Sequence, residues 1–326
     1  MYIYMKITVA SDCSGIETPL MALDRLNVQY EHIFSSDIDK GCKEFIMNNY
    51  KPNVFFDNIK DRDNTKLLKD IDLYVAGFPC QAFSTLGRKK GFDNVKCGDI
   101  FFDVLDYIQD NLPKIFILEN VKGLLTHAKG DTFAIVLKEL NSIGKYNVYH
   151  QILATNDFNI PQSRNRVYIV GIRKDVQTAT FTYPKALPLQ AKLADFFDHN
   201  ATRKPLTGIM IPNLAYMIEK YKLTDISDRI FSVGFGNETW ARLLKDVRLC
   251  PTIATATKFY YTPVNGLMLA NEALALQGID HKMYNWGGVS ESKKYKFAGN
   301  CMTVDVLVHL FRSVFNATSL SAGGAT

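Results

Sequence analysis

Residues 114–121, KIFILENV, decide the fold class of this 326-residue chain. The run Ile115 to Leu118 is wholly apolar, as in a strand buried on both faces of a sheet, and it ends abruptly in Glu119 and Asn120. Other short apolar runs occur at regular distances on either side of it: KITVA (6–10), YEHIFSSD (30–37), DIDLYVAG (70–77) and RVYIVGIR (166–173). Amphipathic stretches of helical length separate them: 19–27, 40–50, 101–111 and 133–143. This alternation predicts an α/β fold, a doubly wound, mainly parallel sheet with helical crossovers.

The rhythm stops after Arg173 and returns near the end. Residues 183–261 hold five prolines and show weaker periodicity, which predicts a second, smaller and irregular domain. Helical patterns reappear at 271–279 and, after the loop AGNC (298–301), at 303–315. We therefore expect a discontinuous first domain, 1–182 with 262–318, an inserted domain at 183–261, and a disordered tail at 319–326.

Composition excludes several classes of protein. The hydrophobic fraction of 47% and the charged fraction of 22% are typical of globular proteins. The six cysteines include no CxxC pair, which argues against a disulfide scaffold or a structural zinc site. No run approaches the roughly 18 apolar residues that cross a membrane, so we expect a soluble intracellular protein with no membrane partner.

The net charge of +5 is mild, but it is unevenly distributed. Residues 185–265 carry eleven basic and seven acidic side chains, which accounts for most of the excess. Such a segment would suit a phosphate backbone, although a solvated surface gives the same pattern. The candidates for contact with DNA are Arg203, Lys204, Arg242, Lys245 and Arg248, with Arg229 included in the set to be tested.

Polar residues gather where the predicted strands end, which is where doubly wound sheets bind ligands. Cys80 follows Pro79 in GFPCQAFS (77–84), and a thiol exposed at a strand end can act as a nucleophile. The other five cysteines (Cys13, Cys42, Cys97, Cys250 and Cys301) have the ordinary interpretation of small core residues. Glu119 is either a proton donor or a structural carboxylate bonded to loop amides.

Two other features have competing interpretations. Asp37 and Asp57 follow strands, where an aspartate is more often a helix N-cap than a ligand of a ribose. Arg164 and Arg166 stand two apart at the start of a predicted strand, so their side chains should leave on one face and share an anion. Ordinary surface ion pairs are the alternative for this pair of arginines.

The ordered set GFPCQ, ENV, QSRNR (162–166) and a late GN (299–300) resembles the cytosine-C5 DNA methyltransferases, in particular the compact bacterial restriction-modification type. GFPCQAFS followed by GRKKGF (87–92) is a long and specific match. The resemblance covers nearly the whole chain apart from about 183–247. It implies a Rossmann-like methyltransferase fold, S-adenosylmethionine as cofactor with S-adenosylhomocysteine as product, double-stranded DNA as partner, and a monomer.

The resemblance also assigns catalytic roles. The cysteine matching Cys80 attacks C6 of a flipped-out cytosine, the glutamate matching Glu119 contacts N3 and the amino group, and the arginine matching Arg166 helps to hold the base, with Arg164 nearby. The residues implied to bind the substrate are Gln81, Ser84, Arg88, Asn120 and Val121. The loop 84–92, with Lys89 and Lys90, is expected to close over DNA, and residues 183–261 to recognise the target.

The cofactor residues follow in the same way. Asp37 matches the acid that binds the ribose hydroxyls, Ile38 the apolar residue beside the adenine, and Asp57 the residue that reads the adenine amino group. Asn58, Ile59, Phe78, Pro79, Gly299 and Asn300 complete the implied pocket together with Asp12, Cys13 and Gly15.

The first loop, SDCSGIETP (11–19), departs from the family pattern. Ser11 stands where an acid is expected, Cys13 where an aromatic residue often stands, and Glu17 and Thr18 where glycines are usual. We expect Asp12 to supply the acid from the next position.

Three other functions share features with this sequence. The tRNA-methylating branch shares the catalytic loops but carries a Cys-Phe-Thr signature that is absent here, so DNA is favoured. A catalytically inactive DNA-binding relative would explain the altered first loop but not the presence of Cys80, Glu119 and Arg166. A nicotinamide-dependent enzyme would need a GxGxxG loop, which the chain lacks.

Overall fold

The computed structural model describes residues 3–4, 6–66, 70–79 and 100–322. The chain forms two compact units, each described below by itself. Unit 1 consists of Met1–Leu153, Asn165–Pro184 and Val306–Thr326, and unit 2 of Ala154–Arg164 and Lys185–Asp305.

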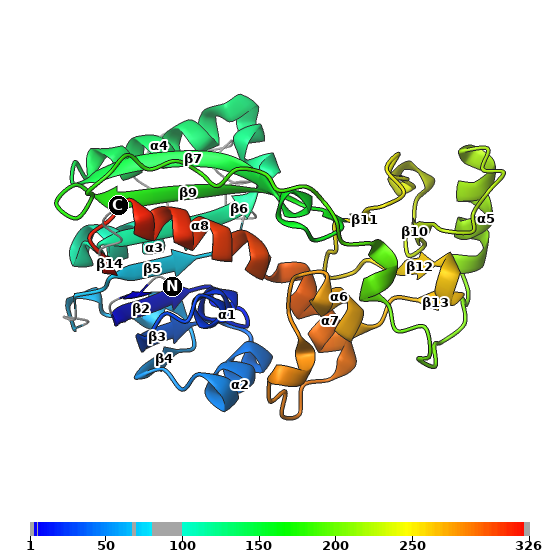
Figure 1. Ribbon diagram of the computed structural model, residues 1–326, viewed down its shortest axis with the longest axis horizontal. Helices are drawn as coiled ribbons and strands as arrows, with labels where there is room; N and C mark the ends of the chain where they lie inside the picture. Colours follow the sequence, from blue (N-terminus) through cyan, green and yellow to red (C-terminus); the bar gives the residue numbers. More distant parts are fainter. Residues whose placement is uncertain (1–2, 5, 67–69, 80–99, 323–326) are drawn as a thin grey trace. The chain divides into compact units, whose positions relative to one another are not determined.

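Unit 1 is built on a seven-stranded sheet (Figure 1). The strands, in spatial order, are β4 (Val54–Phe56), β3 (Tyr30–Ser36), β2 (Ile7–Asp12), β5 (Leu73–Ala76), β6 (Ile115–Val121), β9 (Asn165–Arg173) and β7 (Tyr146–Ala154). The first five run parallel, and β9 pairs with β6 in the antiparallel sense. The predicted doubly wound, mainly parallel sheet is confirmed.

Helices cover both faces of this sheet. They are α1 (Thr18–Arg25), α2 (Lys40–Asn49), α3 (Ile100–Asn111), α4 (Asp131–Ser142) and α8 (Val304–Asn316). Helices α3 and α4 pack on one face through a cluster that includes Phe101, Val136 and Phe116. Figure 1 shows α8 lying across the opposite face. The central strands are therefore buried on both faces, which explains the wholly apolar run 115–118.

Gly171 in β9 lets the ring of Phe116 lie against the backbone of its neighbour strand. A Cβ added at Gly171 would stand 2.0 Å from Cε1 of Phe116. We expect Gly171→Ala to lower the free energy of unfolding by about 1–3 kcal/mol, because a buried ring in a packed core must then move. Chemical denaturation measures the change. Gly123→Ala is the matched control, since its nearest neighbour would be 3.9 Å away, and an equal loss in the two variants would contradict the prediction.

The order of the strands fixes where a ligand can enter unit 1. The chain leaves β2 for β3 and β4 on one side, then returns to β5 on the other side of β2. The carboxyl ends of β2 and β5 therefore flank the topological switch point, which is the usual ligand crevice of such sheets. The described residues that follow β2, β3, β5 and β6 all start from this edge of the sheet.

Unit 2 contains smaller elements. It has a three-stranded sheet of β10 (Ile230–Ser232), β12 (Phe259–Tyr261) and β13 (Gly266–Leu267), and a parallel pair of β8 (Gln162–Ser163) and β11 (Cys250–Pro251). Its helices are α5 (Met210–Lys220), α6 (Ala270–Ala275) and α7 (Glu291–Asn300). Met217 of α5 packs with Phe231 and Val233 in a separate apolar cluster.

Several elements differ from the prediction. β7 was missed because Asn147, His150 and Gln151 interrupt its apolar residues, and β4 because it is only three residues long. α5 was missed because Pro212 lies within its first turn. The expected loop at 298–301 is largely helical, being the last turn of α7. Residues 262–305 belong to unit 2 instead of the sheet unit, and within the expected tail Ser321–Ala322 forms β14, paired with β1 (Ile3–Tyr4).

No helix in the described part of the chain is long and apolar enough to cross a membrane.

Candidate active site

Glu119 and Arg166 form a buried ion pair at the carboxyl end of β6. Nε of Arg166 lies 3.1 Å from Oε1 of Glu119, and both side chains are largely buried. The pair forms because β9 runs antiparallel to β6, which brings the start of β9 beside the end of β6. A guanidinium offsets the cost of keeping this carboxylate in a poorly solvated place.

Asn120 joins the end of β6 to the segment after β5. Its Nδ2 donates to the carbonyl oxygen of Phe78 at 2.9 Å, and its Oδ1 accepts from the N–H of Val121 at 2.8 Å. Phe78 is buried, Pro79 is exposed, and Val121 is 39% exposed. Asn120 therefore binds the backbone of Phe78, which is two residues before Cys80. The predicted residues Cys80, Gln81, Ser84 and Arg88, like Lys89, Lys90 and Cys97, lie outside the described residues.

Arg164 and Arg166 make different contacts: Arg166 pairs with Glu119, whereas Arg164 binds backbone carbonyl oxygens. Arg164 precedes β9 and belongs to unit 2, whereas Arg166 belongs to unit 1. Arg164 is 1% exposed, and its guanidinium donates to the carbonyl oxygens of Ile253 (2.9 Å), Gly299 (3.1 Å) and Cys301 (2.7 Å). These contacts make Arg164 a structural residue of unit 2. Sequence spacing missed this because the strand begins one residue after Arg164.

Asp37 and Ile38 present a polar group and an apolar side chain together at the end of β3. The Asp37 carboxylate accepts from the N–H groups of Gly15 and Asp39, both at 2.8 Å. Burial raises the pKa of Asp37, whereas these two backbone hydrogen bonds lower it. Ile38 is 82% exposed. The cap of α2 is Asp39, which accepts from the N–H of Gly41, so the helix-cap interpretation does not hold for Asp37.

Gly15 leaves open space beside Asp37. Its φ of +57° lies in the left-handed region, and a Cβ built on it would meet nothing within 4 Å. An ionised acceptor held by two amides, an exposed apolar side chain and an open turn suit a ribose and an adenine ring. The described residues therefore fit the adenosine part of S-adenosylmethionine.

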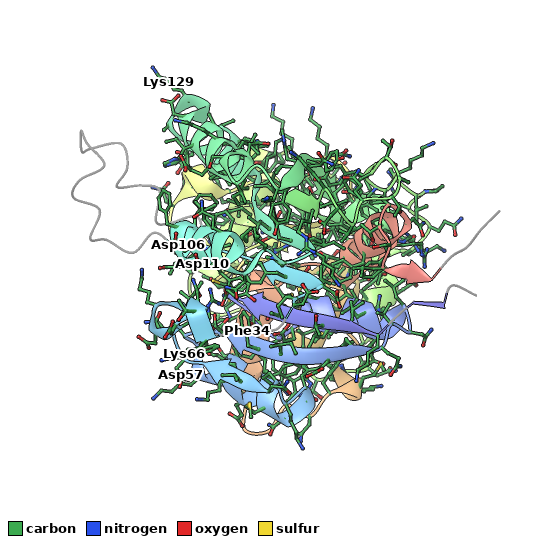
Figure 2. All side chains as sticks on the ribbon, turned by 90° about the vertical axis from the view of Figure 1, so that its left-hand side faces the viewer. Phe34, Asp57, Lys66, Asp106, Asp110 and Lys129 are labelled. Carbon is green, nitrogen blue, oxygen red and sulfur yellow. The ribbon has the colours of Figure 1, made fainter. Side chains whose placement is uncertain are left out.

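Asp57 presents its side chain to solvent at the surface (Figure 2), Asn58 is partly exposed and Ile59 is buried. Both of its oxygens accept from Nζ of Lys43 at 2.8 Å. Asn58 caps a short 3-10 helix, Ile59–Asp61, by accepting from the N–H of Lys60, and Ile59 packs into the core.

Asp12 does not take the place of the expected acid, because its carboxylate is buried and already bound. It accepts from Ser36 Oγ and Tyr74 Oη, each at 2.5 Å, and forms an ion pair with Arg62. The Arg62 guanidinium also lies 4.4 Å from the ring centre of Tyr107. Arg62 was not singled out from the sequence because DNIKDRDN (57–64) reads as a solvated turn.

Cysteines of the described residues follow the ordinary interpretation. Cys42, Cys250 and Cys301 are buried. Cys13 is partly buried with a φ of +50°, and burial, followed by the charges of Asp12 and Asp37, raises the pKa of its thiol far above the ordinary range. A neutral thiol is a poor nucleophile, so no cysteine of the described residues competes with Cys80 for that role.

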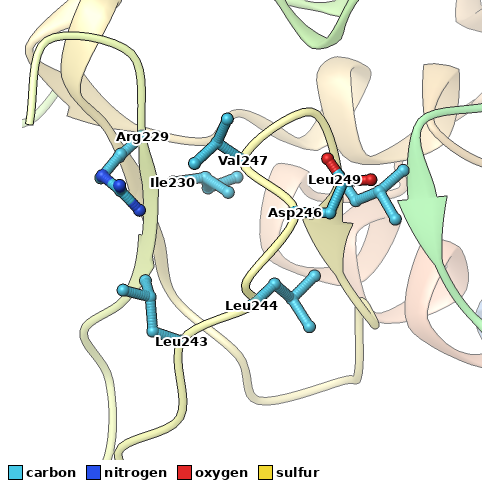
Figure 3. A pocket seen from close by; sticks show the side chains of 7 residues that line it. All are labelled: Arg229, Ile230, Leu243, Leu244, Asp246, Val247 and Leu249. Atoms are coloured by element: carbon cyan, nitrogen blue, oxygen red, sulfur yellow. The ribbon is translucent and has the colours of Figure 1, made fainter. Parts of the chain in front are cut away.

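The basic residues of unit 2 that were expected to contact DNA have different environments. Arg203 is not available to DNA: its guanidinium contacts both carboxylate oxygens of Glu272, at 2.5 and 2.9 Å, and also the carbonyl oxygens of Leu267 and Asp198. Arg248 pairs with Asp246 at the surface. Lys204, Arg242 and Lys245 are exposed. A small pocket near these residues is lined by Arg229, Ile230, Leu243, Leu244, Asp246, Val247 and Leu249 (Figure 3).

The GN pair at the end of α7 has two different environments. Asn300 is exposed. Gly299 is buried, and a Cβ there would stand 2.6 Å from the backbone N of Thr255. Only a glycine lets α7 approach this backbone so closely. Among the described residues no three His, Cys, Asp or Glu side chains gather as a metal site.

Comparisons with known proteins agree with this geometry. The family model for C-5 cytosine-specific DNA methylase matches residues 7–316. The chain is similar to the Type II methyltransferase M.HaeII of Haemophilus aegyptius, with 30% identity over 323 residues that cover 98% of this chain and 95% of that protein. It is also similar to the Type II methyltransferase M.SsoII of Shigella sonnei, with 32% identity over 322 residues that cover 93% and 78%.

Solved structures share the fold. The Dnmt2 methyltransferase of S. pombe has a TM-score of 0.67 at 17% identity, covering 95% of this chain and 99% of that one. A putative DNA modification methyltransferase encoded in an E. coli prophage has a TM-score of 0.67 at 15% identity, covering 96% and 99%. The sequence matches extend over nearly the whole chain, and the chain therefore belongs to the C-5 cytosine-specific DNA methylase family.

Proposed function

We propose that this cytosine-C5 DNA methyltransferase works through covalent addition of Cys80 to a cytosine flipped out of double-stranded DNA at a specific short sequence. One observation carries the proposal. The Glu119–Arg166 ion pair stands at the end of β6, and Asn120 of the same strand end binds the backbone that leads into Cys80. The base must leave the helical stack, because C5 and C6 are inaccessible within it.

The proposed chemistry uses Cys80, Glu119 and Arg166 of this chain, with S-adenosylmethionine as methyl donor and water as the acceptor of the C5 proton. Sγ of Cys80 forms a bond to C6, and the electron pair of the C5–C6 double bond becomes available at C5 for methylation. C5 takes the methyl group with release of S-adenosylhomocysteine. The C5 proton then passes to water as the bond between Sγ and C6 breaks, which restores the ring and the thiolate. Glu119, held in place by Arg166, contacts N3 and the amino group of the base and stabilises the charge that develops during addition.

The cofactor pocket is proposed to lie at the ends of β2 and β3. S-adenosylmethionine, when bound, supplies an electrophilic methyl group. Asp37 would accept the ribose hydroxyls, Ile38 would cover the adenine, and Asp57 would bind its amino group. The hydrogen bonds of Asp37 to Gly15 and Asp39 support this assignment, since they fix the direction of the carboxylate before any ligand arrives.

Asp37→Ala is expected to weaken binding of S-adenosylmethionine by about 1.5–3 kcal/mol, the range for hydrogen bonds to a charged group. Calorimetry without DNA measures the effect. Asp39→Asn, which keeps a capping side chain in the same loop, is the matched control and should bind normally. Because burial raises the pKa of Asp37, its carboxylate is protonated, and affinity lost, at a higher pH than for an ordinary aspartate. Unchanged affinity in the alanine variant would contradict the assignment.

Residues 183–261 are proposed to recognise the DNA target. Replacing a side chain that reads a base should relax preference at one position by about 1–3 kcal/mol, whereas replacing a phosphate contact should weaken all sequences and flatten the salt dependence. Alanine variants of Lys204, Arg229, Arg242, Lys245 and Arg248, measured on a site library at two salt concentrations, separate these outcomes. Arg203→Ala should instead destabilise unit 2, since Glu272 is left buried and unpaired. If none of the five changes specificity, affinity or salt slope, the segment does not recognise DNA.

Activity and target are tested together by methylation of a random-sequence duplex with labelled cofactor, followed by bisulfite sequencing. A methylated short sequence supports the proposal, and absence of any methylated cytosine contradicts it.

A further inference from the structure

Glu17 occupies an unusual position in the loop after β2. It is the residue before α1, its φ is +56°, and its side chain is fully buried. A left-handed conformation costs a non-glycine residue roughly 1 kcal/mol or more. Burial of a carboxylate adds a further cost. An arrangement with two such costs needs a compensating set of contacts.

The compensating contacts come from the ends of β2 and β3. Oε1 of Glu17 accepts from Ser11 Oγ at 2.5 Å and from Ser35 Oγ at 2.6 Å. Nε2 of His32 lies 3.5 Å from the same oxygen and 2.9 Å from Ser35 Oγ. Each serine has a single hydroxyl proton, and both protons go to Glu17, so His32 donates to Ser35.

The same network continues into the turn of the loop. Ser14 Oγ lies 2.7 Å from Ser11 Oγ, 3.2 Å from the Ser11 carbonyl oxygen and 3.1 Å from the Ser36 carbonyl oxygen, so its single hydroxyl proton stays within this network. Ser14 also accepts from the N–H of Ser36 at 3.0 Å and donates its own N–H to the Ser36 carbonyl oxygen at 2.9 Å. The N–H of Gly15, the next residue, is the group that holds the Asp37 carboxylate.

We infer that Glu17 is a positioning residue for the cofactor pocket: its buried carboxylate holds Ser11, Ser14 and Ser35 in one network, and through it fixes Gly15 against Asp37. The inference rests on the proposed role of Asp37 in binding the ribose. Glu17 itself touches no cofactor, since it is fully buried. Asp12 cannot serve instead, because its carboxylate is bound by Arg62 and Tyr74.

The structure predicts which replacements of Glu17 are tolerated. Oε2 of Glu17 has no hydrogen-bond donor among the described residues. In Glu17→Gln the amide oxygen can still accept the hydrogen bonds of Ser11 and Ser35. The amide nitrogen takes the place of Oε2, which accepts no hydrogen bond from the described residues. In Glu17→Ala the acceptor is lost. In Glu17→Gly the acceptor is lost as well, but the left-handed backbone becomes unstrained.

The test is calorimetric binding of S-adenosylmethionine to the full-length variants, with kcat and the KM for DNA measured in parallel. Glu17→Ala and Glu17→Gly should raise Kd for the cofactor about fivefold or more, while kcat at saturating cofactor and the KM for DNA stay within about twofold of wild type. Glu17→Gln should restore the wild-type Kd. Tyr146→Phe, which removes another buried hydrogen bond of unit 1, to the carbonyl oxygen of Pro113, is the matched control for a purely structural loss and should leave Kd unchanged.

Several results would overturn the inference. If Glu17→Gly binds the cofactor as tightly as wild type, the carboxylate is not needed. If Glu17→Ala does not fold, Ser35→Ala removes one donor of the network and should still raise Kd about threefold, so an unchanged Kd in that variant also refutes the inference. Asp37→Ala separates the two proposals. Weak binding by Asp37→Ala with normal binding by Glu17→Ala defeats only the positioning role, and normal binding by Asp37→Ala defeats the pocket itself.

Discussion

Cys80→Ala is expected to abolish methyl transfer, with a fall in kcat of roughly 10⁴-fold or more, the scale found when a covalent nucleophile is removed. The variant should still bind the DNA target, because the thiol is needed for bond formation and not for docking. Wild-type protein should form a stable covalent adduct with a duplex that carries 5-fluorocytosine. The fluorine at C5 cannot leave as a proton, so the bond between Sγ and C6 persists and is visible as a shifted band on a denaturing gel.

Two controls make this result specific to Cys80. Cys42→Ala removes a buried thiol of α2 and should retain activity and adduct formation. The Glu119→Gln variant should retain Cys80 but form the adduct far more slowly, because the side chain proposed to contact the base edge then carries no charge. Normal turnover by Cys80→Ala, or no adduct with an active wild-type protein, would refute the assignment of the nucleophile.

Arg62→Met is expected to lower the free energy of unfolding by about 3–5 kcal/mol, because it leaves the buried Asp12 carboxylate without its cation. Asp12→Asn combined with Arg62→Met should recover much of this loss, since no buried charge then remains. Chemical denaturation of the single and double variants measures both effects.

The matched control is an exposed ion pair of the same segment. Lys66 pairs with Asp63 at 2.9 Å at the surface, where Lys66 is labelled in Figure 2. Lys66→Met should leave the denaturation midpoint unchanged, because exposed pairs contribute little. An equally small effect of Arg62→Met would show that the Asp12–Arg62 pair does not support the sheet.

The sheet could be predicted from the sequence because its signal is local. Apolar runs in the sequence correspond to β2, β3, β5, β6 and β9. Because Asp37 and Glu119 stand at the ends of such runs, the sequence alone could place both side chains at strand ends. β7 was not predicted because this edge strand carries the polar residues Asn147, His150 and Gln151 and has no continuous apolar run. Local periodicity therefore predicts which strands are buried better than it predicts where the sheet stops.

The partners of the long basic side chains could not be predicted. Arg62 meets Asp12 across 50 residues, Arg203 meets Glu272 across 69, and Arg164 meets Gly299 across 135. An arginine in a sequence looks the same whether it binds a phosphate or a buried carboxylate. Only the tertiary contacts distinguish the two, and they removed Arg203 and Arg164 from the residues expected to meet DNA or substrate.

The three-segment construction of unit 1 has a consequence for how the protein emerges from the ribosome. Helix α8 and strand β14 belong to the same unit as β1 and β2, yet they are synthesised only after unit 2, and β14 pairs with β1. The sheet must therefore wait, with one apolar face uncovered, until unit 2 has been made and α8 has followed. A nascent chain arrested before residue 306 exposes that face, so chaperone dependence during synthesis should end only after α8 has been made.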